Sequence, residues 1–207
     1  MLLMIPGPAG PLEALLDTPL GAPRAAVVFA HPHPIYGGTM HTRAVYHGAK
    51  GLTQIGCAVL RFNFRGVGTS AGGFDQGRGE VDDFRAALNE MYDRYPGVPL
   101  WAAGFSFGAW VALETGATDP RVSALIGIAP PVAGHGFAFP QTLESRTPKF
   151  FIQGDLDALC PLKDLRAFYA RLHEPKELVV IDGASHLFEG QTREVGEALE
   201  DLLGDLT

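Results

Sequence analysis

Three things are scarce in this chain of 207 residues: cysteine, clustered positive charge and long apolar runs. Two cysteines, Cys57 and Cys160, are too few for a disulfide framework. The net charge is −7 and no segment gathers Lys and Arg, which argues against nucleic acid or an anionic membrane as a partner. No apolar run approaches the roughly 20 residues that cross a bilayer. The first ten residues lack a basic segment and soon meet proline, so we expect a cytoplasmic protein without a signal peptide.

Glycine, by contrast, is abundant, with 26 residues, which suggests many tight turns between strands and helices. Apolar residues make up 46% of the chain, enough to bury a full core. There is no internal repeat, low-complexity block or linker. We therefore expect a single domain over residues 1–207.

Apolar runs rich in β-forming residues alternate with helical patterns along the chain. Such alternation predicts an α/β fold, with parallel strands joined by crossovers and helices on both faces of the sheet. In these sheets, chemistry gathers beyond the carboxyl ends of the strands. The expected strands are 1–5, 11–17, 24–30, 57–64, 99–105, 122–129, 149–154 and 176–182, and the expected helices are 42–54, 80–95, 108–117, 162–172 and 192–204.

The segment Gly104-Phe105-Ser106-Phe107-Gly108 has the pattern G-x-S-x-G. A predicted strand precedes it and a predicted helix follows it, which is the context of a nucleophile elbow. The glycines allow a tight turn that exposes the Ser106 hydroxyl at the helix N-terminus. The alternative is a glycine-rich turn whose serine caps the helix.

A serine nucleophile needs a base, and the base needs an orienting carboxylate. For an elbow of this kind the chain order is serine, acid, histidine. The loop "GDLDALCP" supplies Asp155 and Asp157, and the later loop "DGASHLFEG" supplies His186. Each lies just after a predicted strand, and from position alone either aspartate could serve.

Backbone N–H groups must also stabilise the oxyanion of the transition state. One is expected from Phe107, directly after the serine. The other should come from the loop that begins at His31 and reads "HPHPIYGG". Proline has no N–H, so His33 is the first candidate after His31, and Ile35 is the second. Two histidines without a third ligand are a poor zinc site, so we expect neither metal nor cofactor.

Several quoted segments together resemble the α/β-hydrolase superfamily: the strand that ends in "HPHPIYGG", "VLRFNFRGVGTS", "GFSFGA", "GDLDALCP" and "SHLF". "FNFRGVGTS" with "HPHP" is similar to small hydrolases related to dienelactone hydrolases and to serine aminopeptidase-like esterases. The resemblance implies a mostly parallel sheet whose first one or two strands are antiparallel, and a Ser-His-Asp triad.

The resemblance also favours one of the two acids. Related enzymes carry G-x-x-D-x-x-V/C-P in this loop, which aligns with Gly154, Asp157 and Pro161. The implied triad is therefore Ser106, His186 and Asp157, and Asp155 stays as the alternative with an otherwise structural role. True dienelactone hydrolases have cysteine in the elbow, so their substrate does not carry over to this chain.

Only residues 130–147 separate the sixth and seventh predicted strands, where larger relatives insert a cap. We expect a minimal cap and an apolar substrate site, with contacts from Ile35, Tyr36, Phe105 and Phe137. Arg65 could bind a substrate carboxylate or pair with an acidic neighbour to brace its loop.

These residues predict a serine hydrolase of the carboxylesterase type that cleaves a small ester or thioester through an acyl-enzyme on Ser106. A peptidase or amidase of the same fold is an alternative, and so is a non-catalytic scaffold. The partner is then a small-molecule ester, and the sequence leaves the oligomeric state open.

Overall fold

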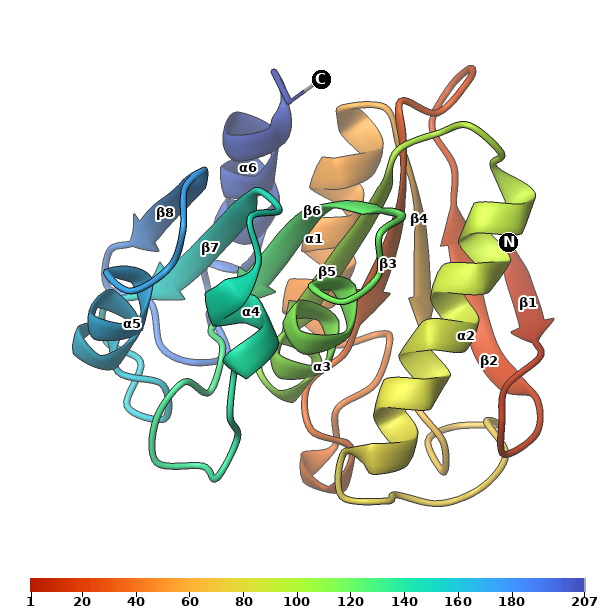
Figure 1. The fold of residues 1–207 in the computed structure, drawn as a ribbon, viewed down its shortest axis with the longest axis horizontal. Coiled ribbons are helices and arrows are strands. Elements are labelled where there is room, and N and C mark those ends of the chain that lie inside the picture. Colours follow the sequence, from red (N-terminus) through yellow and green to blue (C-terminus); the bar gives the residue numbers. More distant parts are fainter. Residues whose placement is uncertain (207) are drawn as a thin grey trace.

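A computed structural model describes residues 1–206, and its centre is one eight-stranded sheet with the strand order β1-β2-β4-β3-β5-β6-β7-β8 (Figure 1). The strands are β1 Leu2–Ile5, β2 Leu12–Asp17, β3 Ala25–Ala30, β4 Cys57–Phe62, β5 Leu100–Phe105, β6 Val122–Ile128, β7 Lys149–Gly154 and β8 Lys176–Ile181. The helices are α1 Arg43–Gln54, α2 Arg78–Arg94, α3 Phe107–Gly116, α4 Pro140–Glu144, α5 Leu162–Tyr169 and α6 Thr192–Leu203, and a 3₁₀ turn covers Pro34–Tyr36.

The sheet is mostly parallel, as the sequence predicted. β1 and β2 pair antiparallel, and β2 pairs antiparallel with β4. Every other pairing is parallel. The parallel strands therefore end at a common rim, which lies at the bottom of Figure 1.

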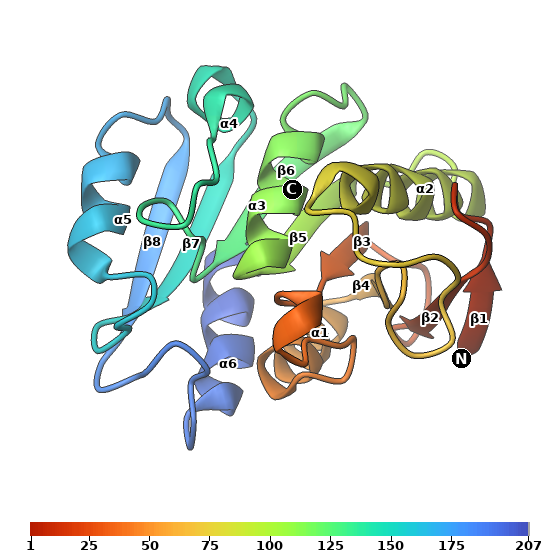
Figure 2. The ribbon, with the colours of Figure 1, turned by 90° about the horizontal axis from the view of Figure 1, so that it is seen from below.

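Helices cover both faces of this sheet. Figure 2 shows α1 and α6 on one face and α2, α3, α4 and α5 on the other. Every residue of β3, β4, β5 and β7 is buried as a result. Burial on both faces explains why these strands are nearly continuous apolar runs without alternation, interrupted by the buried Arg61, Lys149 and Gln153. No helix within residues 1–206 is long and apolar enough to cross a membrane.

Two short elements escaped the sequence analysis: α4 and the 3₁₀ turn Pro34–Tyr36. α4 begins at Pro140, where the missing N–H of proline costs no helical hydrogen bond. The Glu114 carboxylate of α3 accepts hydrogen bonds from the backbone N–H groups of Gln141 and Thr142 in its first turn. The stability of α4 thus comes from a residue distant in sequence, which local patterns do not reveal.

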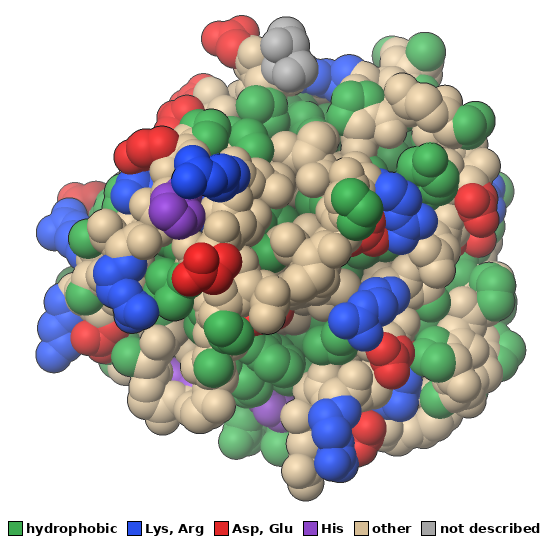
Figure 3. Space-filling view, in the orientation of Figure 1, with side chains coloured by type: hydrophobic (Ala, Val, Ile, Leu, Met, Phe, Trp, Pro, Cys, Tyr) green, Lys and Arg blue, Asp and Glu red, His purple; other side chains and the backbone are tan. Residues whose placement is uncertain are grey.

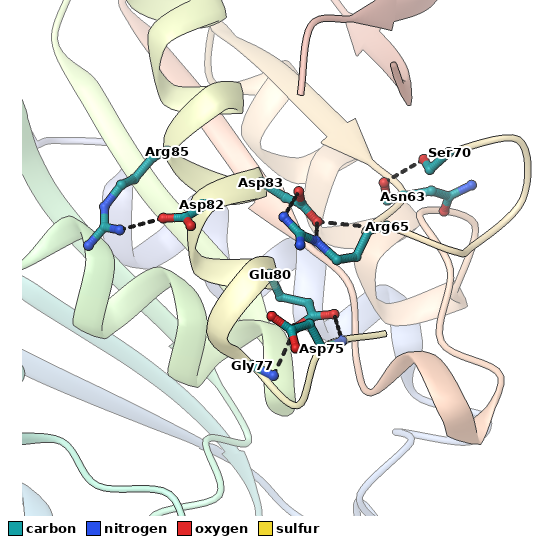
Figure 4. Close-up of polar contacts among 9 residues, drawn as sticks. All are labelled: Asn63, Arg65, Ser70, Asp75, Gly77, Glu80, Asp82, Asp83 and Arg85. Atoms are coloured by element: carbon teal, nitrogen blue, oxygen red, sulfur yellow. Dashed lines mark hydrogen bonds and ion pairs between the residues drawn. The ribbon is translucent and has the colours of Figure 1, made fainter. Parts of the chain in front are cut away.

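The loop between β4 and α2 is held by buried acidic side chains of α2 (Figure 4). Asp83 accepts hydrogen bonds from the backbone N–H of Arg65 at 3.0 Å and from two of its guanidinium nitrogens at 3.0 and 2.8 Å. The Glu80 carboxylate accepts hydrogen bonds from the backbone N–H groups of Asp75 and Gly77. Arg65 therefore braces the loop, and its guanidinium is engaged by Asp83.

The charges that face the viewer in Figure 3 are mixed, with positive and negative side chains interspersed over the helices. Several of them form pairs that are open to water, such as Arg85 with Asp82, whose side chains are 53% and 56% exposed. The pair of Arg65 with Asp83 differs, because the Asp83 side chain is fully buried. This contrast gives a matched test of how the loop is held.

We predict that Arg65→Ala lowers the free energy of unfolding by about 3 kcal/mol, because it leaves the buried Asp83 carboxylate without its partner. Arg85→Ala removes the exposed pair of the same helix and should cost less than about 1 kcal/mol. Urea denaturation of both variants and the wild type measures the difference. Equal losses in the two variants would contradict this account of the loop.

Candidate active site

Ser106 occupies the sharp turn between β5 and α3, with φ 54° and ψ −119°. A positive φ is costly for a residue with a Cβ, so the surrounding chain must hold it. The Ser106 N–H donates to the Ile128 carbonyl oxygen at 2.8 Å, which fixes the turn to the neighbouring strand. A Cβ on Gly104 would collide with the Gly108 carbonyl, and one on Gly108 would collide with the His31 carbonyl. Both flanking glycines are therefore required by close backbone approach.

His186 and Asp157 meet Ser106 at the rim of the sheet. His186 lies in the loop after β8, and its Nε2 is 3.0 Å from the Ser106 Oγ, although the residues are 80 positions apart. Its Nδ1 is 2.7 Å from the Asp157 Oδ2. The structure thus brings these three side chains into one hydrogen-bonded series.

The Asp157 carboxylate fixes the imidazole tautomer. An ionised carboxylate only accepts hydrogen bonds. The His186 Nδ1 must therefore carry a proton and donate it in the hydrogen bond to Asp157. The Nε2 then presents a lone pair toward the Ser106 hydroxyl. This arrangement can take the hydroxyl proton when serine attacks an electrophile.

The Asp157 side chain is fully buried, and backbone groups of its own loop hold it by hydrogen bonds. Its Oδ1 accepts the backbone N–H groups of Leu159 at 2.9 Å and Cys160 at 2.8 Å. Its Oδ2 also accepts the Gln153 side-chain amide at 2.9 Å. The Asp155 carboxylate instead accepts the Gly183 backbone N–H at 2.6 Å, so it joins two loops.

Gln153 is a site residue that the sequence analysis missed. It is fully buried near the end of β7 and donates to both Asp157 and the Cys160 carbonyl oxygen. The available signal was its position, since a lone amide near the end of the apolar run "KFFIQG" needs a partner when buried.

The two predicted oxyanion donors belong to two different segments, the start of α3 and the loop after β3. Phe107 is the first residue of α3, and first-turn N–H groups have no intrahelical partner. The His33 carbonyl oxygen accepts the N–H groups of Tyr36 and Gly38, which folds the loop into a tight turn. No hydrogen bond within residues 1–206 uses the His33 N–H. Both residues line the same cleft as Ser106.

His31 ties this loop to the segment that follows β4. Its Nε2 accepts the Phe64 N–H at 3.1 Å, and its Nδ1 therefore donates to the Pro32 carbonyl at 2.6 Å. Burial lowers the pKa of His31 to about 4, so its ring stays neutral at pH 7. In "HPHP" the first histidine thus has a structural position and the second reaches the cleft.

The cleft above Ser106 has a volume of about 480 Å³. Of the four predicted substrate contacts, Tyr36 and Phe137 line it, but Ile35 and Phe105 do not. Ile35 is 61% exposed outside it, and Phe105 is fully buried with its ring against His186. The lining contains no Lys, Arg, Asp or Glu: Pro32, His33, Tyr36, Gly38, Ser106, Phe107, Pro131, His135, Phe137, Leu159, Cys160, His186 and Leu187.

A series of aromatic rings forms one wall of the cleft. The His33 and Phe107 ring centroids are 4.8 Å apart, and Phe137 follows at 5.8 Å from Phe107. The Trp110 indole N–H donates to the Ala138 carbonyl at 2.9 Å and anchors the segment after β6. The His135 Nε2 lies 2.7 Å from the Leu159 carbonyl oxygen across the cleft. The short segment between β6 and β7 is therefore a wall rather than a full cap.

Asp157, Cys160 and His186 form the one cluster within residues 1–206 that brings three ligand atoms close enough for a metal. The carboxylate oxygens already accept hydrogen bonds, and burial beside Asp157 raises the pKa of the Cys160 thiol to about 12. Cys160 therefore keeps its proton at neutral pH. These three side chains therefore suit the hydrogen bond between Asp157 and His186 better than they suit a bound metal ion.

Comparison with known proteins identifies relatives of this chain. The sequence model of the serine aminopeptidase S33 family matches residues 21–145. An uncharacterised protein of Rickettsia prowazekii is 38% identical over 206 residues, which cover 95% of this chain and 86% of that protein.

Two solved structures are similar over nearly their whole length. An α/β serine hydrolase homologue from Coxiella burnetii is 40% identical with a TM-score of 0.91, covering 98% of this chain and 97% of that one. An α/β serine hydrolase without a lid from Xanthomonas campestris is 35% identical with a TM-score of 0.89, covering 98% and 93%. With its elbow, sheet and short cap segment, this chain belongs to the serine aminopeptidase S33 family of α/β serine hydrolases.

Proposed function

We propose that the protein is a serine esterase that cleaves small uncharged esters through an acyl-enzyme on Ser106. The observation that carries the proposal is the continuous series from the Ser106 Oγ to His186 at 3.0 Å and from His186 to Asp157 at 2.7 Å. Its serine end lies in an open cleft.

In the proposed reaction, the Ser106 Oγ attacks the ester carbonyl while the His186 Nε2 takes its proton. The carbonyl oxygen becomes an oxyanion that accepts the N–H groups of Phe107 and His33, each worth about 3 kcal/mol in the transition state. The imidazolium, stabilised by Asp157, then protonates the departing alcohol. Water, deprotonated by His186, attacks the acyl-enzyme and releases the acid.

The cleft favours an uncharged substrate. Its lining holds no charged side chain that could pair with a carboxylate or an ammonium group. An aminopeptidase substrate carries a free ammonium group, whose burial without a counter-charge is costly. Esters are therefore preferred over peptides here, and thioesters share the same acyl chemistry.

The proposal needs no cofactor and no macromolecular partner. We place the enzyme in the cytoplasm, where free thiols such as Cys57 and Cys160 are stable. The net charge of −7 supports a small-molecule substrate over nucleic acid or an anionic membrane.

We predict that Ser106→Ala lowers kcat/KM for p-nitrophenyl butyrate by at least about a thousandfold, because the nucleophile is lost. Circular dichroism should show an unchanged fold. A fluorophosphonate probe should label the wild type at Ser106 and leave the variant unlabelled. Persistent hydrolysis in the variant refutes the nucleophile, and a wild type that neither hydrolyses nor labels favours a non-catalytic scaffold.

Substitution of the two aspartates in the loop after β7 should affect activity differently. We predict that Asp157→Asn lowers kcat about 10⁴-fold, because an amide donor at this position selects the wrong imidazole tautomer. Asp155→Asn is the matched control, since Asp155 contacts Gly183 and not His186. It should lower kcat less than about tenfold. A larger loss in Asp155→Asn would reassign the acid.

Substrate charge should also matter. We predict that p-nitrophenyl butyrate has at least about tenfold higher kcat/KM than the alanyl ester and the hemisuccinate ester of p-nitrophenol, because the cleft offers neither acyl group a counter-charge. All three esters release the same alcohol, so absorbance at one wavelength compares them. A preference for either charged ester would contradict the assignment of an uncharged substrate.

A further inference from the structure

Gln153 has a hydrogen-bond arrangement that packing alone does not explain. Its Nε2 donates to the Asp157 Oδ2 at 2.9 Å and to the Cys160 carbonyl oxygen at 2.7 Å. Its Oε1 is buried and has no hydrogen-bond partner within residues 1–206. An unpaired buried carbonyl is costly, so an apolar side chain would fill this space more cheaply.

The orientation of the amide is fixed by its neighbours. Both groups beside the Nε2 are acceptors: a carboxylate oxygen and a backbone carbonyl. Turning the amide over would place its own oxygen against two other oxygens. The NH₂ group must therefore face Asp157, and the unpaired Oε1 is the consequence of that requirement.

The two acceptors of the Gln153 amide, the Asp157 carboxylate and the Cys160 carbonyl, belong to the same loop after β7. Asp157 and Cys160 are also linked by the Cys160 N–H, which donates to the Asp157 Oδ1 at 2.8 Å. Gln153 therefore closes a ring of hydrogen bonds around the carboxylate from the rigid end of β7. This ring leaves the Asp157 Oδ2 directed at the His186 Nδ1.

We propose that Gln153 is a positioning residue that orients the Asp157 carboxylate and sets the basicity of His186 through it. This inference rests on the proposed function. The Gln153 amide withdraws charge from the same oxygen that faces the imidazole. Removing it concentrates negative charge on that oxygen, which stabilises the imidazolium and raises the pKa of His186 relative to the wild type.

The surroundings of the imidazole contain few other groups that could move its titration. The other titratable side chains that line the cleft are His33, Tyr36, His135 and Cys160. The lining includes no Lys, Arg, Asp or Glu. Burial lowers the pKa of His33 and raises that of Cys160, so both are uncharged near neutral pH. Asp155, the other carboxylate of the loop, is bound to the Gly183 N–H.

The test compares Gln153→Met and Gln153→Glu with the wild type. Met fills the space without a donor. Glu keeps the shape of the amide, but its buried carboxyl faces two acceptor oxygens, so it keeps its proton and donates a hydrogen bond to only one of them. Gln54→Met and Gln54→Glu are the controls, because Gln54 is exposed at the end of α1 and lies outside the cleft.

In Gln153→Met we expect kcat for p-nitrophenyl butyrate to fall about tenfold with KM nearly unchanged, because Gln153 does not line the cleft. The acidic limb of the kcat/KM profile should move to higher pH by at least about 0.5 unit, and by less in Gln153→Glu, whose protonated carboxyl retains one donor. Both Gln54 variants should match the wild type. A profile that stays in place overturns the proposal, whether or not kcat falls, because a merely structural role would change rate and melting temperature alone.

NMR titration of the His186 ring separates this proposal from the proposed function, since it needs no substrate. The imidazole should titrate at higher pH in Gln153→Met than in the wild type, and the shift in Gln153→Glu should be smaller. An unchanged titration refutes the role of Gln153 even in an active enzyme. A shifted titration in a protein that hydrolyses no ester supports the positioning role and refutes the esterase instead.

Discussion

The close approach of backbone at the Ser106 turn is the constraint on which the site depends. β5 must pass into α3 within one residue, and the Gly104 and Gly108 backbones touch neighbouring carbonyl groups where a Cβ would not fit. This forces Ser106 into a positive φ and points its side chain away from the sheet. The strain is borne by buried strands on both sides, since β3 and β6 pair with β5 along their length. Ser106 is thus positioned by a central strand of the sheet that is paired on both sides.

The other two members of the series lie on loops, and hydrogen bonds between polar groups fix these loops in addition to packing. The acid loop closes on Asp157 through backbone N–H groups and Gln153. The histidine loop is tied to it through Asp155 and Gly183. The loop after β3 depends in turn on the neutral ring of His31, which donates to one backbone group and accepts from another. The acid loop and the loop after β3 therefore each carry a buried polar side chain, Asp157 and His31, that satisfies backbone groups.

Much of the fold followed from the sequence because the alternation of buried strands and amphipathic helices is strong and local. The G-x-S-x-G segment was recognisable because its glycines and flanking elements are contiguous. The pairing of Asp157 rather than Asp155 with His186 needed the resemblance, since both aspartates stand after the same strand. Ile35 and Phe105 could not be placed from sequence. The side a residue faces in a short 3₁₀ turn or at a strand end depends on tertiary packing, and Phe105 faces the core under His186. Gln153 escaped for a similar reason, because its partners are carboxylate and carbonyl groups that only the folded loop assembles.

The division between rigid sheet and adaptable loops bears on how the cleft selects its substrate. The reacting groups are fixed at the rim of the sheet, whereas most of the wall residues, such as Tyr36, Phe137 and Leu187, belong to connecting segments. Changes in those segments can alter the shape of the cleft without moving the serine. The wall is not fully independent, however, because the Phe107 ring packs against His33 while its N–H lies beside the nucleophile. Here the cleft wall and the two proposed oxyanion donors share the residues His33 and Phe107, so under the proposed mechanism a change in their rings alters both binding and rate.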